Sequence, residues 1–151
     1  MEAGSLIMTV LIIQLVAIGG AYLFARISEN KGNIYSLTIM NIIWVLVCGL
    51  AFFVNTEIQF FGLAFIVGLI MGGVQALSRA TFSKLIPEET EDHASFFSFY
   101  DVTFNVSIVV GTIAYGTIEY IAGSMRFSAL GLGVLFIIGL FLLRSVQVRK
   151  T

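Results

Sequence analysis

Long apolar runs separated by short polar turns make up most of the chain. The runs cover residues 5–24, 34–54, 60–77, 94–122 and 127–143. An α-helix rises 1.5 Å per residue, so about twenty apolar residues cross a hydrocarbon core that is roughly 30 Å thick. The pattern therefore predicts five transmembrane helices in a single transmembrane domain, residues 1–151. The fourth run is long enough to tilt within the bilayer or to project beyond it.

The composition supports an all-α membrane protein. Hydrophobic residues make up 58% of the chain and charged residues only 11%, whereas soluble domains carry about 25% charged residues. The lipid bilayer is thus the first partner that the sequence predicts. A net charge of -1 gives no sign of nucleic-acid binding, so we expect none.

Basic residues are distributed unevenly among the turns. Of the eight, seven fall in the first turn, the third turn and the tail: Arg26, Lys31, Arg79, Lys84, Arg144, Arg149 and Lys150. The second and fourth turns hold only Arg126. Because basic residues accumulate on the cytoplasmic side, we expect the amino terminus outside and the carboxyl terminus in the cytoplasm. The expected location is the bacterial inner (plasma) membrane.

Small residues recur every four positions in the third run. They are Gly68, Gly72, Ala76 and Ala80. On a helix they form one smooth ribbon, the kind of surface through which helices pack closely in lipid. Pro87, the only proline, is expected to stop this helix because its ring cannot continue the hydrogen-bond ladder. The acidic residues that follow it predict a solvated turn.

A few polar side chains lie within the apolar runs. Asp101 is the most informative, since an unpaired carboxylate in lipid is costly and is commonly paired, protonated or near water. Asn105 lies one turn further along the same helix face, with Tyr100 nearby. These residues, with Gln75 and Asn41, are the candidates for a substrate or proton pathway. The alternatives are an interfacial anchor for Asp101 and interhelical hydrogen bonds for Gln75 and Asn41.

The sequence offers no catalytic or metal-binding constellation. Its single cysteine, Cys48, lies in an apolar run, and its single histidine, His93, lies in the acidic turn. A metal site or a nucleophilic triad needs more than these two residues. We therefore expect neither an enzyme nor a protein with a metal ion or other cofactor.

Three segments carry a resemblance to a known family. Residues 25–33, Ala-Arg-Ile-Ser-Glu-Asn-Lys-Gly-Asn, resemble the loop motif of the major facilitator superfamily. Residues 73–79, with 84–87 and 96–101, are more specific and resemble the tenth and eleventh helices of its vacuole-effluxer branch, the unknown major facilitator family. The resemblance covers nearly the whole chain, which would correspond to the eighth through twelfth helices of a twelve-helix carrier. Asn105 stands where many relatives have a lysine.

The resemblance implies a part of a secondary active transporter that moves small solutes by alternating access. Efflux of amino acids is the activity that the vacuolar branch suggests. Since a carrier's cavity forms between two halves, the chain would be a fragment whose partner is the missing amino-terminal half. The loop motif further implies a cytoplasmic ionic latch between Glu29 and Arg79. The alternative is a non-transporting membrane module that packs against a partner membrane protein.

Overall fold

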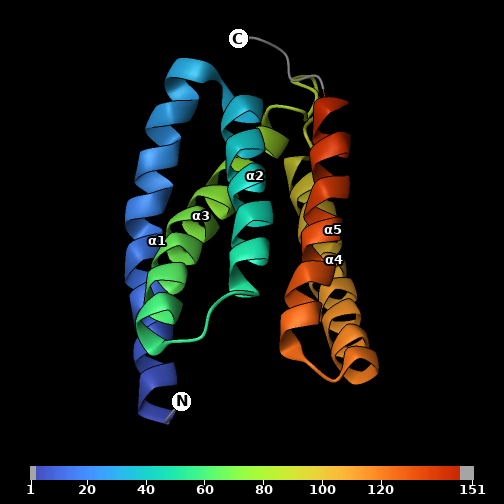
Figure 1. Ribbon diagram of the computed structural model, residues 1–151. Helices are drawn as coiled ribbons and strands as arrows, with labels where there is room; N and C mark the ends of the chain where they lie inside the picture. The colour runs from blue at the N-terminus through green and yellow to red at the C-terminus, as the bar shows by residue number, and fades with distance from the viewer. Residues whose placement is uncertain (1–2, 147–151) are drawn as a thin grey trace.

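Five long helices form the computed structural model, which describes residues 3–146 (Figure 1). They are α1 (Ala3–Lys31), α2 (Asn33–Ala51), α3 (Glu57–Ser83), α4 (His93–Ala122) and α5 (Met125–Arg144). All five are long and apolar enough to cross a membrane, and the described residues contain no strand. The predicted all-α membrane class is confirmed.

The helices extend further than the apolar runs that predicted them. Helix α1 continues to Lys31, through residues 25–31 that we expected to form a turn, and only Gly32 separates it from α2. Gly32 has φ +91°, a conformation that glycine adopts without strain. Helix α3 ends at Ser83, four residues before Pro87, and the ring of a proline clashes with the carbonyl of the residue four positions earlier. The apolar runs match only the part of each helix that lies in the hydrocarbon core, whereas these helices continue beyond it with polar residues.

Local side-chain and backbone features define several helix ends. Thr56 and Gln59 form a reciprocal capping box at the start of α3. The Ser124 side chain accepts a hydrogen bond from the Arg126 N–H at the start of α5. Gly123, at φ +66°, ends α4 in the left-handed conformation. Each of these features satisfies backbone groups that the end of a helix leaves unpaired.

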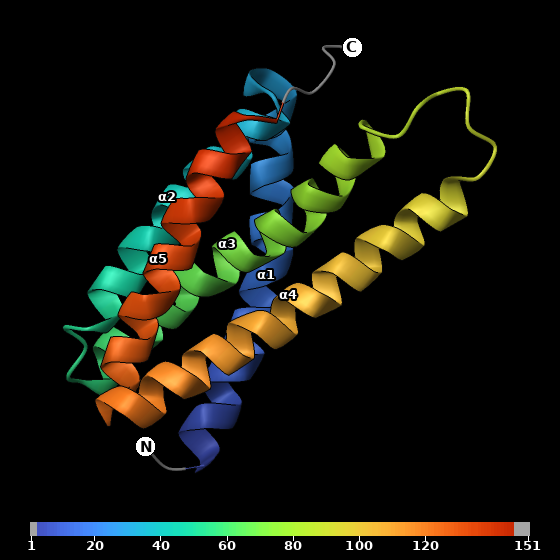
Figure 2. The same cartoon turned by 90° about the vertical axis from the view of Figure 1, so that its right-hand side faces the viewer.

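Helices α1 and α3 form the most extensive contact in the bundle, crossing each other as Figures 1 and 2 show. Helix α2 packs on both α3 and α5, and α4 packs mainly on α5. The buried apolar cluster lies where α1, α2 and α3 meet: Phe24, Met40, Val47, Ile70 and Leu77. Helix α4 has no buried residue. The described chain is therefore a packed group of three helices with a hairpin, α4 and α5, attached through α2.

Glycines allow the backbones of α1 and α3 to touch. A Cβ atom added at Gly72 would overlap the carbonyl oxygen of Ala17, and one at Gly20 would overlap the carbonyl oxygen of Leu69. At Gly68 it would lie 2.8 Å from the carbonyl oxygen of Ile13. The first half of the predicted ribbon thus faces α1. Its second half, Ala76 and Ala80, is exposed.

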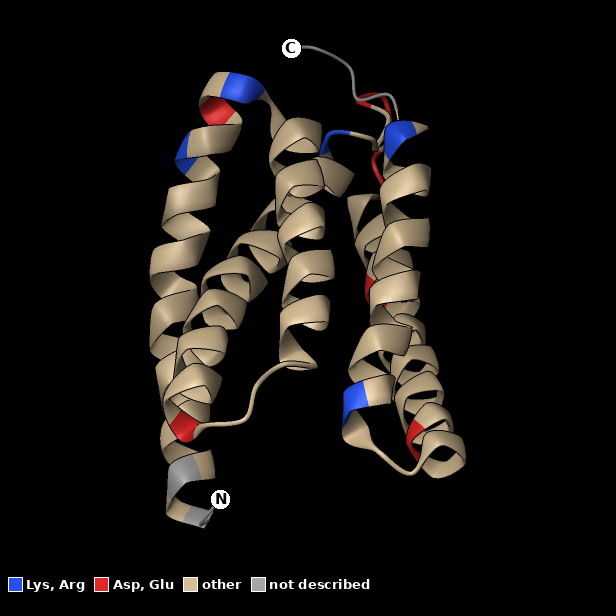
Figure 3. Ribbon diagram, in the orientation of Figure 1, with Lys and Arg blue, Asp and Glu red and all other residues tan. Residues whose placement is uncertain are grey.

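Most of the charged residues lie toward the two ends of the bundle (Figure 3). Lys31 and Arg144 lie in the last turns of α1 and α5, and Lys84 caps the end of α3, so they share one end. Arg126 lies at the opposite end, where it donates to the carbonyl oxygen of Val54 and the side-chain oxygen of Asn55 at 3.1 and 2.7 Å. The fold thus places these basic residues in the same two groups as the charge pattern of the turns.

The cap of α4 gives a prediction for acid conditions. The Asp92 carboxylate accepts the Ser95 N–H at 3.1 Å, and hydrogen bonds from the side chain and backbone of Ser95 lower the pKa of Asp92. A carboxylate whose pKa is lowered by folding stabilises the fold above its unfolded pKa, about 3.9. That stabilisation is lost as the pH falls through the lower, folded pKa. We therefore expect the first turn of α4 to loosen below about pH 4.

Amide hydrogen exchange of the first turn of α4, followed against pH, measures this loosening. Asp92→Asn is the matched control, because asparagine also caps helices but does not titrate. The acid-dependent increase in exchange should be absent from the variant. An identical acid response in both proteins would contradict the role given to Asp92.

Candidate solute site between α3 and α4

An ion pair joins α3 to α4. The guanidinium of Arg79 donates to the carboxylate of Asp101 at 2.5 Å, and the two side chains are 57% and 49% exposed in the described chain. Both residues lie within helices apolar enough to span a membrane. In lipid a lone charge is costly, so charged residues there pair with one another or face water. The pairing therefore accounts for how two charges can occur side by side in this part of the chain.

Tyr100 also connects α4 to α3. Its hydroxyl shares a hydrogen bond with the hydroxyl of Ser78, and its ring lies 5.0 Å from the ring of Phe82, measured between centroids. The guanidinium carbon of Arg79 lies 5.5 Å from the centroid of the Tyr100 ring, within the range of a cation–π contact. One tyrosine thus contacts the apolar and the charged side chains of α3 together.

Two adjoining hollows open beside the ion pair. Gln75, Arg79, Tyr100 and Phe104 line one of about 260 Å³. The other, about 510 Å³, shares Gln75 and Arg79 and is completed by Ala76, Ala80, Ser83 and Phe97. The exposed half of the small-residue ribbon therefore forms part of this wall. We call the residues Gln75, Arg79, Tyr100 and Asp101 the polar junction.

The structure brings some of the candidate residues together and separates others. Gln75, Tyr100 and Asp101 meet in the polar junction. Asn105 lies next to it on α4, but its amide donates to the backbone oxygen of Asp101 at 2.7 Å. Asn41 lies on α2, in a different cavity that is mostly apolar. The candidates thus form one cluster and one separate position.

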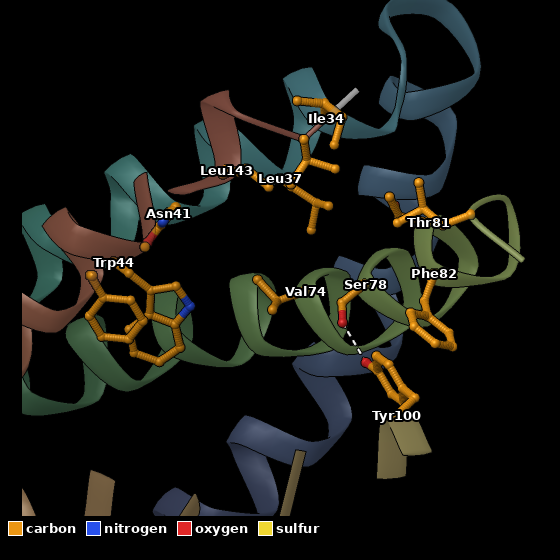
Figure 4. A pocket seen from close by; sticks show the side chains of 14 residues that line it. Ile34, Leu37, Asn41, Trp44, Val74, Ser78, Thr81, Phe82, Tyr100 and Leu143 are labelled. Atoms are coloured by element: carbon orange, nitrogen blue, oxygen red, sulfur yellow. Dashed lines mark hydrogen bonds between the residues drawn. The ribbon is translucent and has the colours of Figure 1, made fainter. Parts of the chain in front are cut away.

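That apolar cavity has a volume of about 420 Å³ and lies between α2, α3, α4 and α5 (Figure 4). Ser78 and Tyr100, joined by their hydrogen bond, lie in its wall. At its other end the rings of Trp44 and Phe136 stack with centroids 5.1 Å apart. Tyr100 also lines the smaller hollow, so it borders both the apolar cavity and that hollow.

Sequence reasoning missed the partner of Asp101. The sequence predicts Arg79 as a topology marker and as one half of a latch with Glu29. In the described structure Arg79 pairs with Asp101 instead, and the exposed Glu29 has no ion-pair partner among the described residues. A partial signal was present, because Arg79 and Asp101 carry opposite charges and lie near the facing ends of two consecutive helices. The turn between the helices does not give their register, since Arg79 lies four residues before the end of α3 and Asp101 lies eight residues after the start of α4.

Metal binding finds no support in the described part of the chain. No group of three or more His, Cys, Asp and Glu residues there is arranged to hold a metal ion. The exposed His93 begins α4, and Cys48 is buried in α2. The chemistry available at the polar junction is therefore charge pairing, hydrogen bonding and aromatic contact.

Comparison with known families decides the relationship. The family profile described as "Vacuole effluxer Atg22 like" matches residues 1–151. The chain belongs to this family. The resemblance to the vacuole-effluxer branch of the major facilitator superfamily is thereby confirmed. The family is described as a vacuole effluxer, and one bacterial relative is named as a transporter of the major facilitator type.

Individual relatives of this Atg22-like chain come from bacteria and fungi. The "Uncharacterized MFS-type transporter YxiO" of Bacillus subtilis is 30% identical over 145 residues, which are 95% of this chain and 33% of the relative. Autophagy-related protein 22-1 of Phaeosphaeria nodorum is 35% identical over 92 residues, 61% of this chain and 16% of the relative. Autophagy-related protein 22 of Saccharomyces cerevisiae is 29% identical over 100 residues, which are 66% of this chain and 19% of the relative.

The matched region is only a part of each relative. The chain spans about a third of the bacterial relative and less of the fungal ones. No solved structure matches the chain.

Proposed function

We propose that this chain is part of a secondary active transporter that moves small solutes, such as amino acids, out across a membrane by alternating access. The observation that carries the proposal is the polar junction: paired opposite charges next to a tyrosine, in an open hollow between two membrane-spanning helices. Charged residues at such positions commonly belong to substrate or ion pathways. Family membership supports a transporter, and the junction supplies a place for the solute.

The polar junction suits a solute with charges of both signs. Arg79 can donate two parallel hydrogen bonds to a carboxylate, and Asp101 can accept hydrogen bonds from an ammonium group. A zwitterionic solute would therefore replace the ion pair by exchanging partners, without leaving a lone charge in the membrane. Asp101 would also be the group that carries a proton, if solute movement is coupled to one.

The proposed partner is the amino-terminal half of the carrier. Helix α4 has no buried residue, and Ala76 and Ala80 are exposed beside the polar junction. Transporter sites of this kind form at the interface between two related halves. The uncovered surface next to the junction is where we place that interface. The same surface also suits the second candidate function, a module that only packs against a partner membrane protein.

Solute flux separates these two functions. The 151-residue chain is reconstituted into liposomes either alone or with a separately expressed amino-terminal half, and uptake of a radiolabelled amino-acid mixture is measured. Flux that requires both parts and is lost in Arg79→Gln supports the proposal. Flux by neither preparation, with both parts shown to be folded and associated, would favour the packing module.

We also propose that the basic end of the bundle faces the cytoplasm of a bacterial cell, across the inner membrane, because basic residues accumulate on that side. In a Cys48→Ala background, a membrane-impermeant thiol reagent should label Glu57→Cys in intact cells. It should label Glu89→Cys only after the membrane is opened. The reverse pattern of labelling would overturn the orientation.

A further inference from the structure

The apolar cavity extends along α2 and α5. On α2 its wall extends from Ile34 to Trp44, and along α5 it extends from Phe136 to Val146. Ten residues at 1.5 Å each give a length of about 15 Å. The stacked rings of Trp44 and Phe136 lie at one end, while Leu85 and Val146 at the other end are 45% and 37% exposed. The cavity therefore opens toward the basic end of the bundle, and the stacked rings mark its other end.

Two cations lie at the same end of the bundle as the open end of the cavity: Lys84 caps α3, and Arg144 lies in the last turn of α5. Each is next in the sequence to a leucine that lines the cavity, Leu85 or Leu143. Lys84 and Arg144 are exposed, and neither has an ion-pair partner among the described residues. The acidic residues between α3 and α4 lie on a loop that leads away from α2 and α5, as Figure 2 shows. The mouth thus combines an apolar channel with positive charge.

We infer that this cavity binds one acyl chain of an anionic phospholipid, with the headgroup held at the mouth by Lys84 and Arg144. An apolar channel of this length accepts a hydrocarbon chain and offers it few hydrogen-bonding groups. Basic pockets between membrane helices hold anionic headgroups, and each nearby Lys or Arg strengthens the attraction. A neutral solute would use the apolar wall but not the cations, so the charge at the mouth selects the anionic lipid.

Trp44 supplies the measurement, since it is the only tryptophan and lines the cavity at the end away from the mouth. The 151-residue chain is placed in mixed micelles with phosphatidylglycerol or phosphatidylcholine whose acyl chains carry bromine, which quenches tryptophan fluorescence on contact. At equal mole fraction, the brominated phosphatidylglycerol should quench Trp44 more strongly. In Lys84→Gln and Arg144→Gln the preference should fall by about fivefold for each cation removed.

Two further variants keep the test decisive. Arg26→Gln with Lys31→Gln removes two cations from the same end of the bundle but away from the cavity, and should retain the preference. Val74→Phe narrows the channel and should reduce quenching by both lipids, while circular dichroism shows that the helices remain. Equal quenching of the original chain by the two lipids, or an unchanged preference in the Lys84→Gln/Arg144→Gln protein, overturns the inference. The test requires no transport and is independent of the proposed function.

Discussion

Leucine in place of Gly72 should separate α1 from α3 and greatly reduce the amount of folded protein. A Cβ atom at this position would lie 2.6 Å from the carbonyl carbon and 2.9 Å from the Cα of Ala17, and closer still to the carbonyl oxygen. Overpacking against side chains typically costs about 1–3 kcal/mol. Here the obstacle is backbone, which cannot rotate aside, so the cost should reach or exceed the upper end. Folded yield by gel filtration and thermal unfolding by circular dichroism, both in detergent, measure the effect.

Two controls separate close packing from a general effect of leucine. Gly62→Leu lies on the same helix, where an added Cβ meets no atom within 4 Å, and it should be tolerated. Ala76→Leu lies in the exposed half of the ribbon and should leave the isolated chain folded. If Gly72→Leu unfolds at the same temperature as Gly62→Leu, the ribbon does not contribute to the α1–α3 contact.

Removing either charge of the polar junction should strongly impair transport. In the carrier reassembled from the chain and an amino-terminal half, Asp101→Asn leaves Arg79 without its partner, and Arg79→Gln leaves Asp101 alone. Each variant also removes a charged group proposed to hold the solute; a hydrogen bond to a charged group contributes about 1.5–3 kcal/mol, so each single variant should lose roughly tenfold or more in flux. The double variant removes both solute contacts and should be at least as impaired as either single one. Initial rates of solute uptake test this.

The pH dependence of the same rates tests the proton-carrying role of Asp101. If Asp101 carries the coupled proton, Asp101→Asn should also lose the response of flux to pH. Glu119→Gln, a carboxylate near the other end of α4, serves as the control and should keep it. Full, pH-dependent flux in Asp101→Asn would leave Asp101 as an anchor of the helix and no more.

The latch between Glu29 and Arg79 stays a prediction for another state of the carrier. Because Arg79 pairs with Asp101 in the described structure, a latch requires Arg79 to change partners during the transport cycle. A contact of this kind near water contributes only about 0.2–1 kcal/mol, which can bias two states without deciding the fold. Glu29→Gln and Arg79→Gln should then be non-additive in flux. Additive effects would exclude the latch.

The sequence alone determined the class and the number of helices. Each apolar run is long enough to cross the hydrocarbon core, and in lipid a single continuous run must satisfy its own backbone groups as a helix. These are properties of one segment in contact with lipid, so no knowledge of its neighbours was needed. The same reasoning could not predict the full length of α1. Its residues 25–31 are mostly polar, so the apolar pattern did not include them in the helix.

Tertiary structure decided which side chains meet. Gly72 and Ala76 are equivalent in the sequence ribbon, yet Gly72 touches α1 and Ala76 is exposed, because the two helices cross and then separate. Arg79 faces Asp101 and not Glu29 for a related reason: the rotation of α3 about its axis is fixed by its packing on α1 and α2. Spacing within a segment gives the face of a helix, but the crossing and rotation of helices depend on contacts between residues far apart in the sequence.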